Sequence, residues 1–314
     1  GFHEARHRAG KQNDVDLIIG TDPDSDRTGI VLKDKFGEYV TLSGNQVGVL
    51  LTDYIITAKK LTNTMPAHPA VLKSIVTTEM PRGGEKNGVA CFDTFTGFKF
   101  LAEKIKQFEQ DGSHEYIFAF EESYGYLCGD YARDKDAVTA SMLIAEMAAY
   151  YRTQGKTLYD AMEEMYEKYG YYCEQTVSIV MPGVSGLQRM KELMQELRDK
   201  PLTQIGTHKV DYTAHMPGTR TCMADGKSEP MELKGQNVMY YELEGGTTFI
   251  IRPSGTEPKV KVYIMAKGEN KAEGRRKGRG SDCCSKGNRK VSQSAVKSSN
   301  AECMPNSGSA STFF

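Results

Sequence analysis

The sequence predicts an α/β fold with a mixed or parallel sheet, followed by a smaller C-terminal α+β domain with an antiparallel sheet. Up to about residue 170, short apolar runs alternate with segments of helical periodicity, as in parallel sheets covered by helices. Beyond that point, three strand candidates follow one another with only short turns between them. The 314 residues are enough for two or three domains with buried cores.

The first part of the chain supplies the expected α/β elements. Each strand is a short apolar run, and the first helix places Val47, Leu50, Leu51 and Tyr54 on one face. Strands are expected at 15–19, 29–32, 71–78, 89–92 and 116–120. Helices are expected at 45–60, 97–108, 136–152 and 157–169.

The pattern changes near residue 170. Residues 174–181 alternate like a half-exposed strand, and 185–198 have the spacing of an amphipathic helix. The crowded strands that predict an antiparallel sheet are 238–243, 247–252 and 259–266. Periodicity stops beyond residue 268, and residues 269–314 are predicted to form a disordered basic tail, with nine Lys or Arg against three acidic residues from Lys271 onward.

Composition limits the partners and the compartment. A formal net charge of −1 predicts neither a nucleic-acid nor a membrane partner. No apolar run approaches the roughly 18 residues of a spanning helix, and residues 1–12 lack the apolar core of a secretory signal. The cysteines have no CxxC spacing, which predicts buried free thiols at Cys91, Cys128, Cys173 and Cys222 and a reducing, cytoplasmic location.

The sharpest motif is Thr21-Asp-Pro-Asp-Ser-Asp-Arg27, which directly follows a predicted strand. Carboxylates at Asp22, Asp24 and Asp26 can converge on one point, and such crowding is costly unless a cation lies among them. A calcium EF-hand is excluded, because Arg27 and Lys33 stand where that loop needs Gly and Glu. The pattern favours Mg²⁺, and the alternative is a solvated acidic turn.

A second group follows the strand at 116–120. Glu121 and Ser123 offer groups suited to sugar hydroxyls at the carboxyl end of that strand, where α/β sheets bind ligands. Arg133 and Lys135 could meet an anion. The alternative is that Asp136 caps the next helix and the two basic residues are ordinary surface charges.

A third group lies between two late strands. Arg252, Ser254, Gly255 and Thr256 suit a phosphate cradle, and the alternative is a Pro/Gly hairpin with incidental hydroxyls. A weaker candidate is Thr96 in Thr94-Phe-Thr-Gly-Phe-Lys99, which would cap the following helix or hold a ligand at its N-terminus.

The sequence resembles the α-D-phosphohexomutase superfamily over residues 13–268. The resemblance lies in the order of its motifs, which are TDPDSDR, TFTGFK, FEESYG with RDKD, and RPSGTEP. Within that superfamily, the bacterial phosphoglucomutase/phosphomannomutase enzymes are most similar. The resemblance implies three similar α/β domains and a smaller C-terminal domain around a cleft. Its implied domains here are the end of the second at 1–40, the sugar-binding third at 41–170 and the phosphate-binding C-terminal domain at 171–268.

The resemblance also implies roles for these residues. Mg²⁺ would be bound by Asp22, Asp24 and Asp26, with Arg27 beside the reacting phosphate. Glu121 and Ser123 would bind the sugar hydroxyls. The other implied substrate contacts are Thr96, Arg133, Lys135, Arg252, Ser254, Gly255 and Thr256. The implied ligands are a hexose phosphate and a hexose 1,6-bisphosphate, because family members move phosphate between the 1- and 6-positions through a phosphoserine.

One departure from the family pattern changes the expected activity. The nucleophilic serine of the family lies in a TASHNP-like segment, and these 314 residues contain none. We therefore expect little turnover from this polypeptide alone. The alternatives are a non-catalytic sugar-phosphate-binding remnant and, less favoured because no DxDxT motif follows a strand, a metal-dependent sugar-phosphate phosphatase. A reading-frame break near Ala272 or a true basic extension would explain the tail.

Overall fold

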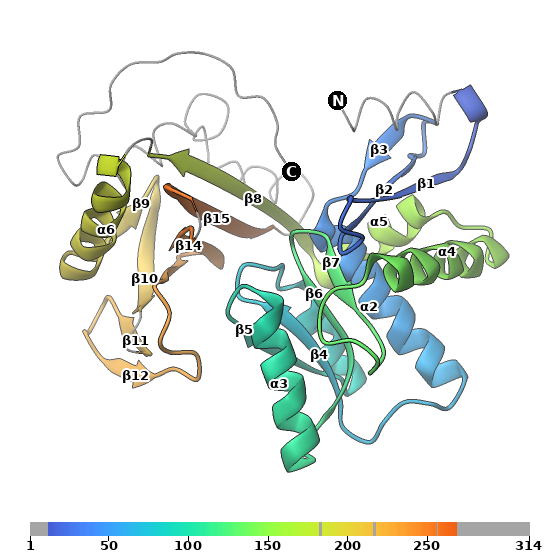
Figure 1. Ribbon diagram of the computed structural model, residues 1–314, viewed down its shortest axis with the longest axis horizontal. Helices are drawn as coiled ribbons and strands as arrows, with labels where there is room; N and C mark the ends of the chain where they lie inside the picture. The colour runs from blue at the N-terminus through green and yellow to red at the C-terminus, as the bar shows by residue number, and fades with distance from the viewer. Residues whose placement is uncertain (1–11, 182–183, 216–217, 256, 269–314) are drawn as a thin grey trace. The chain divides into compact units, whose positions relative to one another are not determined.

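A computed structural model of the chain describes residues 12–181, 184–215, 218–255 and 257–268 (Figure 1). The expectations for residues 269–314, and for the first eleven residues, lie outside this described part. Contacts divide the chain into two compact units, with the division between Tyr172 and Cys173. Each unit is described by itself.

Unit 1 begins with a small antiparallel sheet. It consists of β1 (Leu17–Thr21), β2 (Thr28–Lys33) and β3 (Tyr39–Thr41), in the order β1-β2-β3. Both expected strands are present, with an unpredicted third, and the sheet is separate from the parallel one. Residues 22–27 join β1 to β2 as a short loop, because Thr21 pairs with Thr28.

Helix α2 (Gly44–Leu61) follows, and its start is fixed by a capping box. Ser43 Oγ accepts a hydrogen bond from the Gln46 amide at 3.3 Å, and Gln46 Oε1 accepts one from the Ser43 amide at 2.8 Å. These two bonds satisfy amides that the first helical turn leaves without partners.

The main sheet of unit 1 is mixed, as predicted. Its order is β5-β4-β6-β7, with β4 parallel to both β5 and β6, and β7 antiparallel to β6. The strands are β4 (Pro69–Ser74), β5 (Ala90–Thr94), β6 (Glu115–Glu121) and β7 (Gly125–Leu127). The helices around them are α3 (Phe98–Asp111), α4 (Ala137–Thr153) and α5 (Leu158–Tyr169), and β4 leads to β5 through η1 (Met80–Asn87), a 3₁₀ helix.

Helices cover both faces of this sheet. Ala70 and Leu72 belong to the buried cluster that contains the apolar residues of α3. Val71, Phe118 and Phe120 belong to the cluster that contains those of α2, α4 and α5. Alternate residues of a strand point to opposite faces, so β4 contributes to both clusters.

Among its described residues, unit 2 consists of an antiparallel sheet and one helix. Strands run in the order β12-β11-β10-β13-β14-β15-β8, and β9 pairs with β10. Helix α6 (Val184–Asp199) contributes Met190, Leu193 and Met194 to its core, with Tyr241 and Phe249 from the sheet. The strands are β8 (Tyr171–Val180), β9 (Gln204–Ile205), β10 (His208–His215), β11 (Thr219–Cys222), β12 (Ser228–Pro230), β13 (Met239–Leu243), β14 (Thr247–Pro253) and β15 (Lys259–Gly268).

The observed fold class is the predicted one, with differences in detail. The expected strand at 71–78 ends at Ser74, and the rest forms the turn into η1. Six strands were not predicted from the sequence, namely β3, β7, β9, β10, β11 and β12. Within the described ranges, no helix has the length and apolar character needed to cross a bilayer.

Candidate functional site

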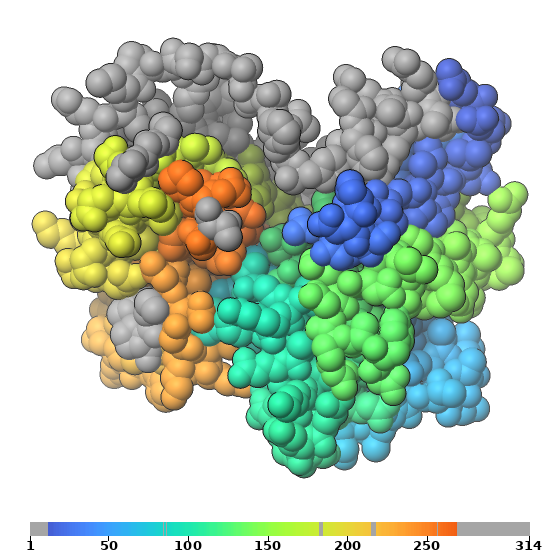
Figure 2. Space-filling view, viewed as in Figure 1, coloured from blue at the N-terminus to red at the C-terminus, as the bar shows by residue number. Residues whose placement is uncertain are grey.

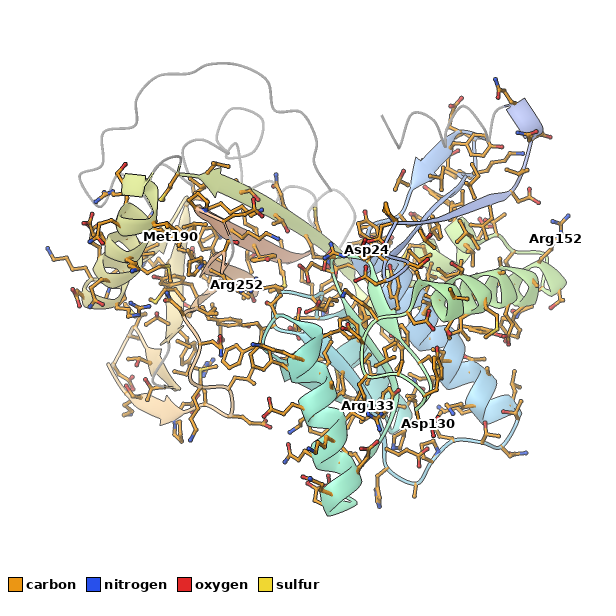
Figure 3. The ribbon with its side chains drawn as sticks, in the orientation of Figure 1. Asp24, Asp130, Arg133, Arg152, Met190 and Arg252 are labelled. Atoms are coloured by element: carbon orange, nitrogen blue, oxygen red, sulfur yellow. The ribbon has the colours of Figure 1, made fainter. Side chains whose placement is uncertain are left out.

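The loop 22–27 is organised by the first of its three carboxylates. Asp22 Oδ1 accepts hydrogen bonds from the amides of Asp26 and Arg27, each at 3.1 Å. Ser25 adopts a left-handed conformation with φ 57°, which tightens the turn. Asp24 stays exposed on the loop, where Figure 3 labels it. The Asp22 carboxylate therefore shapes its own loop.

The same loop is bound to the segment that leads into α4. Lys135 Nζ lies 2.6 Å from Asp26 Oδ2. The Ala137 amide donates to the Ser25 carbonyl at 3.1 Å, and Thr28 Oγ1 donates to the Ala137 carbonyl at 3.1 Å. In the space-filling view, blue atoms of the first strands accordingly lie against green atoms of the α4 region (Figure 2). Asp26 and Lys135, two predicted site residues, are thus brought together.

A second contact joins this loop to the turn after β6. The Thr28 amide donates to the Tyr124 carbonyl at 3.1 Å. Arg27 and Gly125 form an isolated antiparallel bridge. The acidic loop and the predicted sugar-binding turn therefore share backbone contacts within unit 1.

The charges of Asp26 and Lys135 depend on each other. Burial opposes ionisation of Asp26, but the hydrogen bond and charge of Lys135 outweigh it, so the pKa of Asp26 lies below its usual value. Burial likewise disfavours the ammonium form of Lys135, but its bond to Asp26 keeps the pKa above the usual value. Asp26 Oδ1 is buried without a hydrogen-bond partner among the described residues, and Arg27 Nε lies 3.9 Å away.

The three carboxylates do not converge as the sequence reading expected. Within the described part of the chain, no three or more His, Cys, Asp or Glu side chains form a group that could hold a metal ion. Asp22 Oδ1 accepts from the backbone amides of Asp26 and Arg27, whereas Asp26 Oδ2 pairs with Lys135. The donor types still suit Mg²⁺, and the unpartnered Asp26 Oδ1 is an available ligand atom.

Glu121 lies at the carboxyl end of β6, only 6% exposed. Its Oε1 accepts a hydrogen bond from the Gly97 amide at 2.6 Å, directly before α3. The positive end of the helix dipole favours a carboxylate there. Thr96 immediately precedes Gly97, and its Oγ1 is buried with no hydrogen-bond partner among the described residues. Two predicted site residues thus meet at the start of α3.

The turn that carries Ser123 packs tightly on α2. Ser123 itself is half-buried, and Tyr124 has a positive φ of 68°. A Cβ atom on Gly44 would lie 2.1 Å from the Glu122 carbonyl oxygen, so only glycine fits at the start of α2. This close approach fixes the backbone of the turn.

Arg133 contacts helix α3 and not the acidic loop. Its side chain is exposed and forms an ion pair with Glu109 of α3 (Figure 3). Asp136 accepts hydrogen bonds from the Val138 and Thr139 amides, which confirms the alternative that it caps α4. Of the two basic residues predicted here, only Lys135 contacts the acidic loop.

The residues predicted to bind phosphate in unit 2 lie in the hairpin between β14 and β15. Arg252 is half-buried at the end of β14, and Gly255 is exposed. The Ser254 amide donates to the Lys259 carbonyl at 2.8 Å, and Ser254 Oγ accepts from the Glu257 amide at 3.3 Å. These bonds close the hairpin. The predicted residue Thr256 lies outside the described residues.

The structure contains a buried charge network that the sequence reading missed. Lys73, the residue before the last of β4, is 0% exposed. Its Nζ lies 2.8 Å from Glu79 Oε1 and 2.7 Å from Asp93 Oδ1. Arg82 Nε lies 2.6 Å from Glu79 Oε2, and its guanidinium also pairs with Asp93. The available signal was a single lysine inside the apolar run Ala70-Val-Leu-Lys-Ser74.

These pairs keep the buried groups charged. Burial lowers the pKa of Lys73, but the nearby charges of Asp93 and Glu79 outweigh it and raise the pKa above its usual value. Burial raises the pKa of Glu79, but Lys73 and then Arg82 reverse the shift and lower it. Burial raises the pKa of the Cys91 thiol to about 12. Cys91 is therefore an uncharged thiol beside an ionised network.

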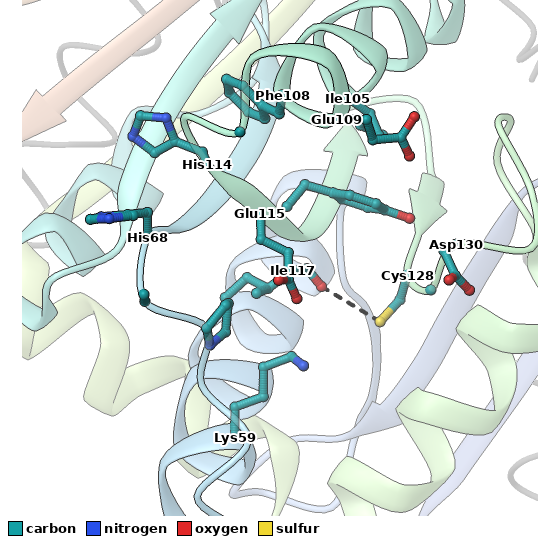
Figure 4. A pocket seen from close by; sticks show the side chains of 15 residues that line it. Lys59, His68, Ile105, Phe108, Glu109, His114, Glu115, Ile117, Cys128 and Asp130 are labelled. Atoms are coloured by element: carbon teal, nitrogen blue, oxygen red, sulfur yellow. Dashed lines mark hydrogen bonds between the residues drawn. The ribbon is translucent and has the colours of Figure 1, made fainter.

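A pocket of about 660 Å³ lies away from these residues (Figure 4). Its lining includes His68, Phe108, Glu115, Cys128 and Asp130. His68 precedes β4 and Glu115 begins β6, so the pocket is at the amino ends of strands whose carboxyl ends lead to the predicted site. None of the predicted site residues lines it.

Two models of one protein family match the chain. Residues 43–169 match the family described as phosphoglucomutase/phosphomannomutase, alpha/beta/alpha domain III. Residues 223–277 match its C-terminal domain. A phosphoglucomutase of Staphylococcus haemolyticus is 36% identical over 260 residues, covering 82% of this chain and 46% of that protein. One from Staphylococcus aureus strain MRSA252 is 35% identical over 269 residues, covering 85% and 47%.

Solved structures share the fold. A phosphoglucomutase/phosphomannomutase family protein of Burkholderia thailandensis has a TM-score of 0.56 at 14% identity, covering 92% of this chain and 49% of its own. The Paramecium phosphoglucomutase parafusin, in an open form, has a TM-score of 0.55 at 15% identity, covering 91% and 45%. The chain spans about half the length of the curated relatives it matches. It belongs to the phosphoglucomutase/phosphomannomutase family.

Proposed function

We propose that the chain carries the magnesium, sugar and phosphate sites of a phosphohexomutase. The reaction moves phosphate between the 1- and 6-positions of a hexose phosphate through a hexose 1,6-bisphosphate. The contact between the acidic loop and the β6–β7 region is the observation that carries the proposal. The Thr28 amide donates to the Tyr124 carbonyl in the turn that follows Glu121, and Lys135, which follows β7, pairs with Asp26. The proposed metal-ligand, cationic and sugar-binding groups named here all belong to unit 1.

The sugar-binding part of the proposal rests on Glu121, Ser123 and Thr96. The Gly97 amide donates to Oε1 of the Glu121 carboxylate, and carboxylate oxygens are acceptors that suit sugar hydroxyls. Thr96 Oγ1 lacks a hydrogen-bond partner in the described structure and would gain one from the ligand. Ser123, half-buried on the adjoining turn, would add a donor.

The phosphate-transfer part rests on the acidic loop and its neighbours. Asp22, Asp24 and Asp26 would hold Mg²⁺, which when bound neutralises charge on the transferring phosphate. Arg27 and Lys135 would orient that phosphate by ion pairing. Lys135 pairs with Asp26 Oδ2, so Asp26 Oδ1 is the oxygen that would bind the metal. Arg133 would line the same site after leaving Glu109.

The hairpin of unit 2 would bind a phosphate. Arg252, Ser254, Gly255 and Thr256 offer a guanidinium, hydroxyls and backbone amides, a combination that suits such a group. A ligand that must bind in two orientations needs such a grip for whichever phosphate is not reacting.

Replacing Glu121 by glutamine is expected to weaken binding of glucose 6-phosphate by about tenfold or more, because a charged acceptor is lost from a partly desolvated site. Isothermal titration measures the change. Glu115→Gln, at the exposed opposite end of the same strand, is the matched control and should bind like the wild type. Equal affinities for all three proteins would contradict the proposed sugar site.

Turnover by the 314-residue polypeptide distinguishes the remaining alternatives. We propose little or no conversion of glucose 1-phosphate to glucose 6-phosphate, because these residues contain no TASHNP-like serine segment to carry the phosphate. Conversion at a rate near that of a whole relative would contradict this. Release of inorganic phosphate would favour the phosphatase alternative, and ligand binding without either reaction would favour the non-catalytic sugar-phosphate-binding protein.

We also propose a reducing, cytoplasmic location for this function. All four cysteines in the described ranges are free thiols, which suits such a compartment. Cys91 is buried as expected, whereas Cys128, Cys173 and Cys222 are only half-buried.

A further inference from the structure

A buried polar cluster lies behind the turn that carries Glu121 and Ser123. Ser74 ends β4 and Thr77 follows it in the connection to η1, and each side chain is 0% exposed. Lys73 lies directly before Ser74 and is equally buried. The function proposed above uses none of these three residues. Their positions nevertheless connect the charge network of β4 to the β6–β7 turn.

Hydrogen bonds form this connection step by step. Lys73 Nζ lies 3.4 Å from the Thr77 carbonyl oxygen. The Thr77 amide donates to the Ser74 carbonyl at 2.9 Å, and the two hydroxyls lie 2.8 Å apart. Thr77 Oγ1 then accepts a hydrogen bond from the Glu122 amide at 3.2 Å. Glu122 immediately follows Glu121, so the last bond fixes the backbone beside the proposed sugar ligand.

A further hydrogen bond ties the segment between β4 and η1 to helix α2. The Thr78 amide donates to Asn45 Oδ1 at 3.1 Å, and both residues are buried. Asn45 belongs to the first turn of α2, beside the Gly44 position that packs on the Glu122 carbonyl. The turn is therefore held through its amide by Thr77 and through its carbonyl by the start of α2.

We propose that Thr77 is a positioning residue for the sugar-binding turn, fixing its backbone and thereby its affinity for the ligand. The proposal rests on the function proposed above. Thr77 would act through the backbone of Glu122, because its hydroxyl is bonded to that amide and its side chain is fully buried. Its effect is to set the direction of the Glu121 and Ser123 side chains before a ligand binds, which avoids an ordering cost on binding.

Amide hydrogen exchange without ligand tests the first half of this inference. Thr77→Val removes the hydroxyl acceptor at nearly constant volume and should accelerate exchange of the Glu122 amide about tenfold or more. Thr77→Ser should restore protection. Thr52→Val is the control, since Thr52 is also buried but its hydroxyl bonds to the Gly48 carbonyl within α2. Unchanged exchange at Glu122 in Thr77→Val, or equal acceleration in Thr52→Val, would overturn the proposal.

Binding of glucose 6-phosphate tests the second half. Thr77→Val should raise the dissociation constant about tenfold, with Thr77→Ser and Thr52→Val close to the wild type. Ser74→Ala, which removes the second hydroxyl of the pair, should have an intermediate effect and serves if Thr77→Val folds poorly. A wild-type protein that binds and a Thr77→Val protein that binds equally well would overturn the positioning role alone. A wild-type protein that does not bind would overturn the proposed function, and the exchange measurement would still decide whether Thr77 fixes the turn.

Discussion

Replacing Lys73 by methionine is expected to lower the free energy of unfolding of unit 1 by about 2–3 kcal/mol. The substitution leaves Glu79 and Asp93 without the ammonium group between them, and removing one partner of a buried ion pair costs about 3–5 kcal/mol. The lower figure applies here because both carboxylates are about one quarter exposed, at 28% and 25%, and Arg82 still pairs with both.

Urea denaturation of the variant measures this loss. Lys33→Met is the matched control, because Lys33 pairs with Asp14, whose side chain is 91% exposed. A surface pair of this kind contributes far less to stability, because water and salt screen its charges. Similar losses for the two variants would contradict the buried network as a source of stability.

Replacing Gly44 by alanine is expected to cost about 2–4 kcal/mol and to abolish binding of glucose 6-phosphate. The new Cβ would lie 2.1 Å from the Glu122 carbonyl oxygen and 2.8 Å from the Tyr124 amide nitrogen. Both are backbone atoms, so the turn must move as a whole rather than by a side-chain rotation. Displacing it redirects Glu121 and Ser123 together.

The control for Gly44→Ala is its neighbour. Ser43→Ala removes the N-cap of the same helix and should cost about 1 kcal/mol while leaving the turn in place. Urea denaturation and titration with glucose 6-phosphate, applied to both variants, separate helix stability from turn position. A Gly44→Ala protein as stable as the Ser43→Ala protein, with wild-type affinity, would contradict the close packing of α2 on the turn.

Periodicity made most of the fold predictable. Helix α3 buries one face, which carries Phe98, Leu101, Ile105 and Phe108, and strand β4 is a mainly apolar segment. The strands at 219–222 and 228–230 were missed because they are short and contain no fully buried residue, so no apolar pattern marks them. Long-range pairing, which creates such strands, leaves no local signal.

The spacing of the motifs predicted which segments form the candidate site, but not which partners their side chains contact. The alternating aspartates predicted an acidic loop, yet Lys135 reaches Asp26 from more than one hundred residues away in the chain. The network of Lys73 was missed for the same reason. Its partner Asp93 is 20 residues further on, across the pairing of β4 with β5. Contacts of this kind depend on tertiary packing rather than on any motif.

Mapping the binding of glucose 1,6-bisphosphate and Mg²⁺ by amide chemical shifts is the most direct test of the proposed site. We expect amide chemical-shift changes in residues 22–27, 96–97 and 121–125, which form the acidic loop, the start of α3 and the sugar-binding turn. The same titration reports on the pocket at the amino ends of β4 and β6, where no shifts are expected. Shifts confined to that pocket, around His68 and Glu115, or no shifts at all, would contradict the account.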